Sequence, residues 1–168
     1  MSLYKTYYDS PIGKLLLVSD NNNLIGLWIK NQKYYLGSLK ENLIEKDDLP
    51  ILMQTKNWLD RYFKCEEPKI DELSLKPDGS KFRKLVWQIL CDIPYGKTRT
   101  YGEIAHEVAS RLHKKSMSAQ AIGGAVSHNP ISIIIPCHRV IGSSGSLTGY
   151  AGGIKIKKDL LELEGVKI

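Results

Sequence analysis

Apolar and polar residues alternate in blocks along the first part of the chain. Two short apolar runs, KLLLVSD at 14–20 and LIGLWIK at 24–30, are separated by three asparagines at 21–23. Apolar runs of this length between turn-forming residues are typical of buried strands. The stretches 35–44 and 51–65 instead repeat apolar residues at helical spacing and predict two helices. Together these elements indicate a small α/β module.

A polar stretch follows this module. Residues 65–80, CEEPKIDELSLKPDGS, end on a proline, an aspartate and a glycine, which favour a turn. We interpret this stretch as a linker. The α/β module is therefore placed at residues 1–75, and a second domain at residues 76–168.

The second domain opens with two amphipathic helices. Apolar residues recur at i, i+3, i+4, i+7 and i+8 over residues 82–90, and this helix is expected to end before Pro94. Thr100 can cap the next helix, with Glu103 three residues later as the reciprocal partner of a capping box. The expected inner face of that helix consists of Ile104, Ala105, Val108 and Leu112.

A third helix of unusual composition follows, AQAIGGAVS at 119–127, which Ser116 or Ser118 can cap. Two helices joined by a short turn are the outline of a helix-turn-helix. The third helix contains Gly123 and Gly124, and each interior glycine costs about 1 kcal/mol relative to alanine. Two explanations are open: the close approach of another helix, or entry into a narrow space such as the minor groove of DNA.

Charge is distributed unevenly along the chain. The net charge of the whole chain is +6, but residues 1–75 carry −1 and residues 76–168 carry +7. A basic half indicates a polyanionic partner, with nucleic acid as the first candidate. A solvated basic face is the alternative.

The start of the chain, its apolar runs and its cysteines exclude several classes of protein. No basic stretch followed by an apolar one opens the chain, and no apolar run approaches the roughly 18 residues of a membrane span. We therefore expect a cytoplasmic protein without a membrane partner. The three cysteines, Cys65, Cys91 and Cys137, are odd in number and widely spaced, which argues against a disulfide framework. No CxxC or HExxH pattern predicts a zinc site, and Cys65 and Cys91 are interpreted as small core residues.

Cys137 has a different context, at the end of an apolar run and directly before His138. The thiolate is the reactive form, and an unperturbed thiol with a pKa of about 8.5 is mostly protonated at neutral pH. A base is therefore needed. In an extended chain the side chain of His138 would point to the opposite face, so a water molecule is expected to relay the proton between the two groups.

A carboxylate near the C-terminus can orient that histidine. In the last predicted helix, IKIKKDLLELEG at 154–165, an apolar face contains Ile156, Leu160 and Leu161, and Glu164 falls on the same face. Buried carboxylates are rarely left unpaired, so a pair between His138 and Glu164 is predicted, with an exposed, frayed helix end as the alternative. A cysteine, a histidine and a glutamate fit several chemistries, including that of cysteine peptidases, whose local signatures are absent here.

The segment IPCHRVIGSSGSLTGYAGG at 135–153 closely resembles the active-site segment of the O6-alkylguanine-DNA alkyltransferases, also called methylated-DNA–protein-cysteine methyltransferases. The core of that family's signature is PCHRV. The resemblance extends upstream through MSAQAIGGAVSHNPISII, downstream through KKDLLELEG, and to YYDSPIGKLLL near the N-terminus. It covers essentially the whole chain.

The resemblance implies an α+β fold, with an N-terminal ribonuclease-H-like α/β module and a C-terminal helical domain that contains the helix-turn-helix. It also implies direct reversal of DNA damage without a cofactor or a metal. The expected partner is double-stranded DNA containing O6-alkylguanine, bound through the minor groove by a monomer, with the damaged base flipped out of the stack. O4 of thymine is an alternative source of the alkyl group. A non-catalytic, alkyltransferase-like damage-binding protein is the second hypothesis.

Site residues follow from the same resemblance. Cys137 would accept the alkyl group irreversibly, once per molecule, after His138 has deprotonated it through a water. Glu164 would orient His138 and stabilise its charge. Tyr101 would donate a hydrogen bond to the base, and Asn129 would brace the segment that holds the cysteine.

The resemblance also implies contacts to DNA and to the flipped base. Gly152 and Gly153 would leave room for the alkyl group. Gln120 stands where the family usually has an arginine that fills the space of the flipped base, which puts in doubt how firmly this chain holds a flipped conformation. The other expected DNA or base contacts are Ala121, Gly124, Arg139, Val140, Ser143 and Tyr150.

Overall fold

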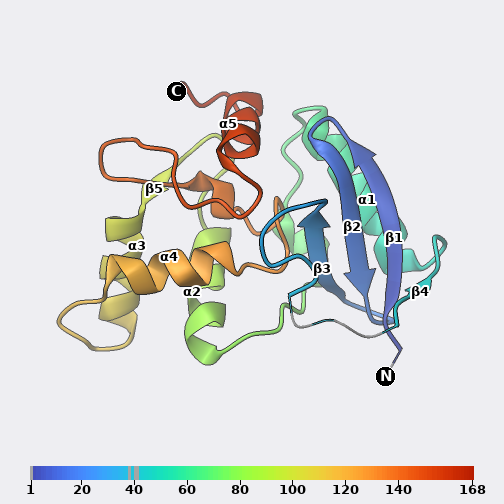
Figure 1. The fold of residues 1–168 in the computed structure, drawn as a ribbon, viewed down its shortest axis with the longest axis horizontal. Coiled ribbons are helices and arrows are strands. Elements are labelled where there is room, and N and C mark those ends of the chain that lie inside the picture. Colours follow the sequence, from blue (N-terminus) through green and yellow to red (C-terminus); the bar gives the residue numbers. More distant parts are fainter. Residues whose placement is uncertain (1, 38, 40–41) are drawn as a thin grey trace. The chain divides into compact units, whose positions relative to one another are not determined.

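The computed structural model describes residues 2–37, 39 and 42–168, which form two compact units (Figure 1). The first unit comprises Met1–Asp78 and Pro130–Ser132, and the second comprises Gly79–Asn129 and Ile133–Ile168. None of the described helices is long and apolar enough to cross a membrane.

A mixed sheet forms the first unit, with strand order β3-β2-β1-β4. Its strands are β1 (Tyr4–Ser10), β2 (Gly13–Ser19), β3 (Leu24–Ile29) and β4 (Ile44–Glu45). The three long strands pair antiparallel, and β4 pairs parallel to β1. The strands predicted at 14–20 and 24–30 are confirmed. Strand β1 was not predicted, because polar residues interrupt its tyrosines so that it contains neither an apolar run nor a regular alternation.

The helix predicted at 35–44 is not found. Residues 38, 40 and 41 lie outside the described part of the chain, residues 35–37 form a turn, and Ile44 lies in β4. The leucines that suggested a helix, Leu36, Leu39 and Leu43, pack individually against the core residues Leu16, Val18 and Trp28. Tertiary packing has overridden the local periodicity.

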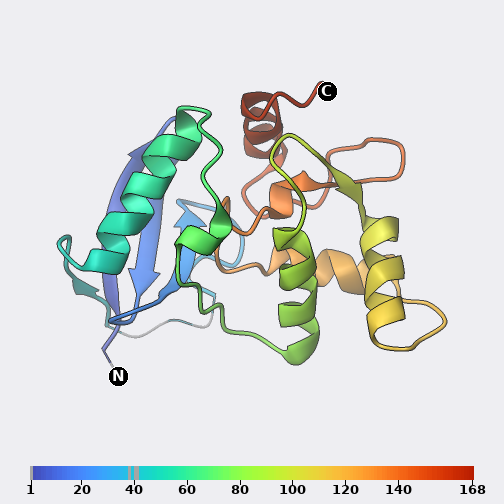
Figure 2. The same ribbon diagram turned by 180° about the vertical axis from the view of Figure 1, so that it is seen from behind.

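Helix α1 (Pro50–Phe63) lies across one face of the sheet (Figure 2). Pro50 occupies the first helical position, where its fixed φ suits the helix and its missing N–H is no loss. The buried face consists of Ile51, Leu52, Thr55, Trp58, Leu59 and Tyr62. The predicted helix is confirmed, but Cys65 is exposed and adopts a φ of +62° just beyond it. The assignment of Cys65 to the core was wrong.

The segment interpreted as a linker is bound to the first unit. Trp58 Nε1 donates to the carbonyl of Lys69 at 2.8 Å, and the amide of Leu24 donates to the carbonyl of Ser74 at 2.8 Å. A short 3-10 turn, η1 (Ile70–Glu72), lies between these contacts. Pro130–Ser132 also joins this unit, because Leu27 exchanges backbone hydrogen bonds of 2.8 and 2.9 Å with it.

The second unit is mainly helical. Its helices are α2 (Lys81–Cys91), α3 (Tyr101–Arg111), α4 (Ala119–Ser127) and α5 (Ile154–Leu163), and β5 (Arg99–Thr100) pairs parallel to β6 (Val140–Ile141). Helices α2 and α3 both pack against α4. The buried apolar residues of these three helices include Val86, Ile89, Leu90, Ile104, Val108, Ile122, Ala125 and Val126.

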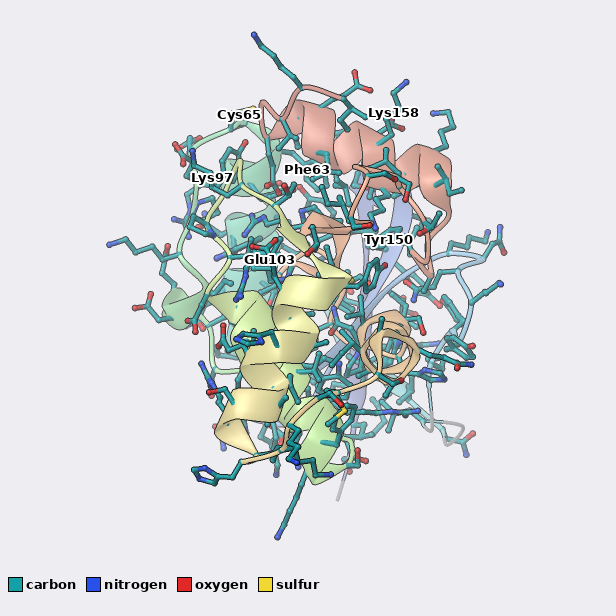
Figure 3. The ribbon with its side chains drawn as sticks, turned by 90° about the vertical axis from the view of Figure 1, so that its left-hand side faces the viewer. Phe63, Cys65, Lys97, Glu103, Tyr150 and Lys158 are labelled. Carbon is teal, nitrogen blue, oxygen red and sulfur yellow. The ribbon has the colours of Figure 1, made fainter. Side chains whose placement is uncertain are left out.

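The helix ends follow the predicted capping chemistry. Thr100 Oγ1 accepts from the amide of Glu103 at 3.0 Å, and Glu103 Oε1 accepts from the amide of Thr100 at 2.9 Å, so the capping box is confirmed in the first turn of α3. Figure 3 labels Glu103 at this end of the helix. Ser118, rather than Ser116, caps α4. Leu112 was wrongly placed on the inner face of α3: it ends that helix and is 38% exposed.

The two glycines of α4 face open space. A Cβ added at Gly123 or Gly124 would meet no atom within 4 Å. The close approach of another helix therefore does not explain them, and the second explanation, a slim surface for an external partner, remains.

Candidate active site

The backbone turns at Cys137. Ile133, Ile134 and Ile135 are buried, and Pro136 then precedes a single 3-10 turn, η2 (Cys137–Arg139). In this turn the side chains do not alternate between two faces as they would in a strand. Cys137 is 4% exposed and the neighbouring imidazole is fully buried.

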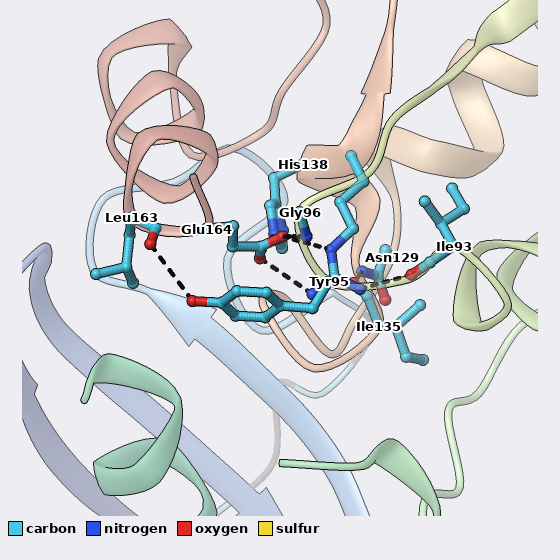
Figure 4. A network of polar contacts seen from close by, with 9 residues as sticks. Ile93, Tyr95, Gly96, Asn129, Ile135, His138, Leu163 and Glu164 are labelled. Atoms are coloured by element: carbon cyan, nitrogen blue, oxygen red, sulfur yellow. Dashed lines mark hydrogen bonds and ion pairs between the residues drawn. The ribbon is translucent and has the colours of Figure 1, made fainter. Parts of the chain in front are cut away.

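His138 is paired with Glu164. Its Nε2 lies 2.6 Å from Oε2 of Glu164, and both side chains are fully buried, which is the pairing expected from the sequence (Figure 4). The alternative of a frayed, exposed helix end was wrong. The other ring nitrogen, Nδ1, is buried and has no hydrogen-bond partner in the described chain. This nitrogen is therefore available to accept a proton.

Arg139 lies inside the protein, although a DNA contact was expected. Its Nε and Nη2 donate to the two carboxylate oxygens of Glu164 at 2.8 and 3.0 Å, and its Nη1 donates to the carbonyl of Ile93 at 2.7 Å. The guanidinium also lies 5.8 Å from the ring centre of Tyr95. With the amide of Gly96 donating at 3.1 Å, Glu164 is held from several sides (Figure 4).

These contacts determine the charge states of the pair. Burial raises the pKa of the Glu164 carboxyl, but the hydrogen bonds of His138 and Arg139 and the charge of Arg139 outweigh burial and hold this pKa well below its usual range. Burial lowers the pKa of His138, and the hydrogen bond to Glu164 opposes that effect. Because the bidentate guanidinium already supplies a full positive charge, we assign Glu164 as an anion and His138 as a neutral ring that donates through Nε2.

The thiol of Cys137 is protonated in the resting site. Burial raises its pKa, while a hydrogen bond with the Asn129 side chain, the charge of Lys157 and nearby backbone amides lower it. Asn129 also donates from Nδ2 to the carbonyl of Ile135 at 2.8 Å, two residues before the cysteine. Its position therefore fits the bracing role implied by the resemblance.

Tyr101 begins α3 and reaches the loop that follows Cys137. Its hydroxyl donates to the carbonyl of Thr148 at 2.8 Å. Burial and the nearby Cys137 raise the pKa of Tyr101 to about 12, so the hydroxyl keeps its proton and can act as a donor.

The remaining predicted residues differ in exposure. Val140 and Tyr150 are buried near the two ends of this loop, whereas Ser143 and Gly153 are exposed and Gly152 is half-buried. On α4, Gln120 and Ala121 are exposed and Gly124 is half-buried. Among the described residues, no group of three or more histidine, cysteine, aspartate or glutamate side chains is placed to hold a metal.

The sequence interpretation missed Lys157. This lysine is fully buried, and its Nζ donates to the carbonyls of Val140 and Thr148, the latter at 3.0 Å. Its position could have been found, because residues 157, 160, 161 and 164 share one helical face, and Leu160, Leu161 and Glu164 had been assigned to that face. Ile156, chosen instead, is half-buried.

Fold and site together define a class: a helix-turn-helix unit that contains a buried cysteine backed by a histidine–glutamate pair. Comparisons with known protein families identify the family within this class. Residues 3–77 match the ribonuclease-like domain of 6-O-methylguanine DNA methyltransferase, and residues 81–166 match its DNA-binding domain. The chain therefore belongs to the methylated-DNA–protein-cysteine methyltransferase family, and its function is DNA repair by alkyl transfer.

Individual relatives agree along the whole chain. The methylated-DNA–protein-cysteine methyltransferase of Haemophilus influenzae is 38% identical over 98% of this chain and 88% of its own length. That of Mycobacterium leprae is 44% identical over 93% of this chain and 88% of its own. Among solved structures, Mycobacterium tuberculosis OGT in complex with DNA has a TM-score of 0.81 and 39% identity, covering 98% of this chain and 92% of that one.

Proposed function

We propose that Cys137 is the alkyl acceptor and removes the group from O6 of guanine in double-stranded DNA, once per protein molecule. The observation that supports this most is the buried, unpartnered Nδ1 of His138, the residue directly after Cys137, with Nε2 held by Glu164. A neutral imidazole held in this tautomer is a general base. Arg139, which we had expected at the DNA, instead keeps Glu164 charged.

The reaction balances with these groups alone. The thiol proton passes through a water to Nδ1 of His138, and the resulting imidazolium is stabilised by the Glu164 carboxylate. The thiolate of Cys137 attacks the alkyl carbon in line, so an S–C bond forms as the C–O6 bond breaks. Tyr101 donates a hydrogen bond from its hydroxyl to the leaving base and keeps its own proton. The departing guanine takes up the proton that the thiol lost, passed on from His138 through water, so His138 returns to its neutral form. The product is a thioether, and no group of the site reverses it.

DNA would be bound by the slim face of α4. The open space over Gly123 and Gly124 supports the approach of an external surface, and the exposed Gln120 and Ala121 lie on the first turn of the same helix. A helix with so few side chains fits the minor groove, which is only about 6 Å wide.

The acceptor is buried, so the damaged base has to leave the stack to reach it. Cys137 is 4% exposed. Val140, Ser143, Tyr150 and Gly152, from the segment that follows it, are proposed to surround the flipped guanine. The proposal includes a monomer acting in the cytoplasm.

Stoichiometry tests this function directly. A duplex with one O6-methylguanine is incubated with increasing protein, and the remaining O6-methylguanine is quantified after digestion of the DNA. We expect loss of one methylated base per protein molecule and no further loss at long times. Tight binding without loss of O6-methylguanine would instead support a non-catalytic damage-binding protein.

Tyr101→Phe should slow methyl transfer by about a hundredfold, because one hydrogen-bond donor to the developing charge is removed. Binding to the methylated duplex should change little. Single-turnover rates measure the effect. Tyr95→Phe is the matched control, since its hydroxyl also donates to a backbone carbonyl, that of Leu163 at 3.4 Å. Equal rates for the Tyr101 variant and the unchanged protein would remove Tyr101 from the mechanism.

Gly124→Ala should separate stability from DNA binding. The added Cβ meets no protein atom, so the free energy of unfolding should rise by up to about 1 kcal/mol. The same methyl group thickens the proposed DNA face, so affinity for the duplex should fall. Urea unfolding and fluorescence anisotropy measure the two effects. Unchanged affinity would argue that this face of α4 does not contact DNA.

A further inference from the structure

Lys157 is a fully buried cation on the inner face of α5. It shares that face with Leu160, Leu161 and Glu164. Lysine is rarely buried without a counter-charge, because removing an ammonium from water is costly. Burial lowers the pKa of Lys157 to about 8. The fold therefore keeps a charge where an apolar side chain would pack at lower cost.

The ammonium is hydrogen-bonded but lacks an ion-pair partner. Nζ donates to the carbonyls of Val140 and Thr148, the latter at 3.0 Å, and Thr148 also accepts from Tyr101 at 2.8 Å. These acceptors are neutral, and no described carboxylate forms an ion pair with Nζ. Lys157 thus ties together both ends of the loop after Cys137 and retains an unneutralised positive charge.

The ionisable groups near this charge leave one candidate for its counter-ion. Tyr101, whose ring centre lies 5.7 Å from Nζ, holds its proton because burial raises its pKa to about 12. Lys157 lowers the pKa of His138, which favours the neutral ring. Glu164 is already paired with Arg139. Of these four described groups, Cys137 is the one that can become an anion in the field of Lys157.

We infer that Lys157 is a positioning residue for alkyl transfer: its buried ammonium stabilises the thiolate of Cys137 and, by its two hydrogen bonds, fixes the carbonyls of Val140 and Thr148. This inference rests on the proposed role of Cys137 as acceptor. The same charge disfavours an imidazolium at His138, so the proton taken from the thiol is passed on rather than retained.

A thiol titration without DNA tests this role. The rate at which iodoacetamide alkylates Cys137, with formation of an S–C bond and release of iodide, is measured by peptide mass spectrometry from pH 5 to 11. Lys157→Met removes the charge, and Lys157→Gln removes the charge but keeps a donor for the carbonyls. Lys158→Met is the control, because it makes the same charge change at an exposed position of α5 (Figure 3). The exposed Cys65 is an internal reference in every sample.

Both Lys157 variants should alkylate Cys137 about tenfold more slowly at pH 7, which corresponds to a rise of about one pKa unit. The rates should converge with those of the unchanged protein at high pH, where the thiolate forms in all of them. Cys65 and Lys158→Met should show no shift. If both variants lower the Cys137 rate equally at every pH, or leave it unchanged, Lys157 has only a packing role and the inference is wrong.

Methyl transfer provides a separate readout. If Lys157 acts through the thiolate, the single-turnover rate from an O6-methylguanine duplex at pH 7 should fall by the same factor as alkylation. A shifted thiol titration together with no methyl transfer in the unchanged protein would refute the proposed function while leaving the effect of Lys157 on Cys137 intact.

Discussion

Cys137→Ala should abolish methyl transfer, with a rate loss of at least about a thousandfold, while binding to O6-methylguanine DNA is retained. No other cysteine can substitute for it. Cys91 is half-buried, and burial together with Asp92 raises its pKa to about 11. Cys65 belongs to the first unit and is not part of the described site.

The measurement combines single-turnover transfer with fluorescence anisotropy on the same duplex. Cys65→Ala is the matched control and should transfer at the unchanged rate. Residual transfer by Cys137→Ala above that of heat-denatured protein would mean that another group accepts the methyl, and the proposed chemistry would be incorrect.

Glu164→Gln should lower the free energy of unfolding by about 3–5 kcal/mol, because removing one partner of a buried ion pair leaves the other charge uncompensated. The stranded charge is the guanidinium of Arg139, whose contacts to the two carboxylate oxygens measure 2.8 and 3.0 Å. In glutamine one of these oxygens becomes an NH2 group and the negative charge is gone. The imidazolium of His138 also loses its stabilising carboxylate, so transfer should slow by about a hundredfold or more. Glu162→Gln, at an exposed position of α5, is the control.

The same pair makes stability depend on acid. The pKa of Glu164 is lower in the folded protein than in the unfolded chain, where it is about 4.3. The contribution of the ionised Glu164 to the free energy of unfolding is therefore fully present above pH 4.3 and is lost as the pH falls toward its pKa in the folded protein. The pKa of His138 is also lower in the folded protein than in the unfolded chain. Protonation of His138 in the unfolded chain therefore lowers the stability of the folded protein further as the pH falls below about 6.5.

Urea unfolding from pH 3 to 7 measures this dependence. The unchanged protein should lose stability steadily in acid, and Glu164→Gln should lose less of its stability below pH 4.3 than the unchanged protein does. Parallel pH profiles for the two proteins would show that Glu164 is not held as an anion, and the charge assignment of the site would have to be abandoned.

Sequence periodicity identified helices α1 to α5, strands β2 and β3, and one decisive contact. Leu160, Leu161 and Glu164 share a helical face, and this spacing placed a carboxylate in the interior, where the structure pairs it with His138 at 2.6 Å. The capping signal at Thr100 and Glu103 likewise located the start of α3, and therefore Tyr101. Helical spacing and capping residues predicted a position correctly where the geometry of a single helix determines it.

The errors concern partners that periodicity does not encode. Arg139 follows the signature histidine and was expected at the DNA, but Glu164 and Ile93 hold it inside the protein. Lys157 was passed over because lysine is usually exposed, although its spacing matched the inner face of α5. A charged side chain is usually expected at the surface. Only the tertiary structure shows that two backbone carbonyls bind the buried Lys157 and that a carboxylate binds the buried Arg139.

The central claim is that the alkyl group ends on Cys137, and localising the adduct tests it most directly. The protein is incubated with a duplex containing O6-methylguanine, digested, and analysed by tandem mass spectrometry. We predict one added methyl group, on the sulfur of Cys137, with Cys65 and Cys91 unmodified. An unmodified Cys137 in protein that has bound the duplex, or a methyl group found on a different residue, would contradict the account.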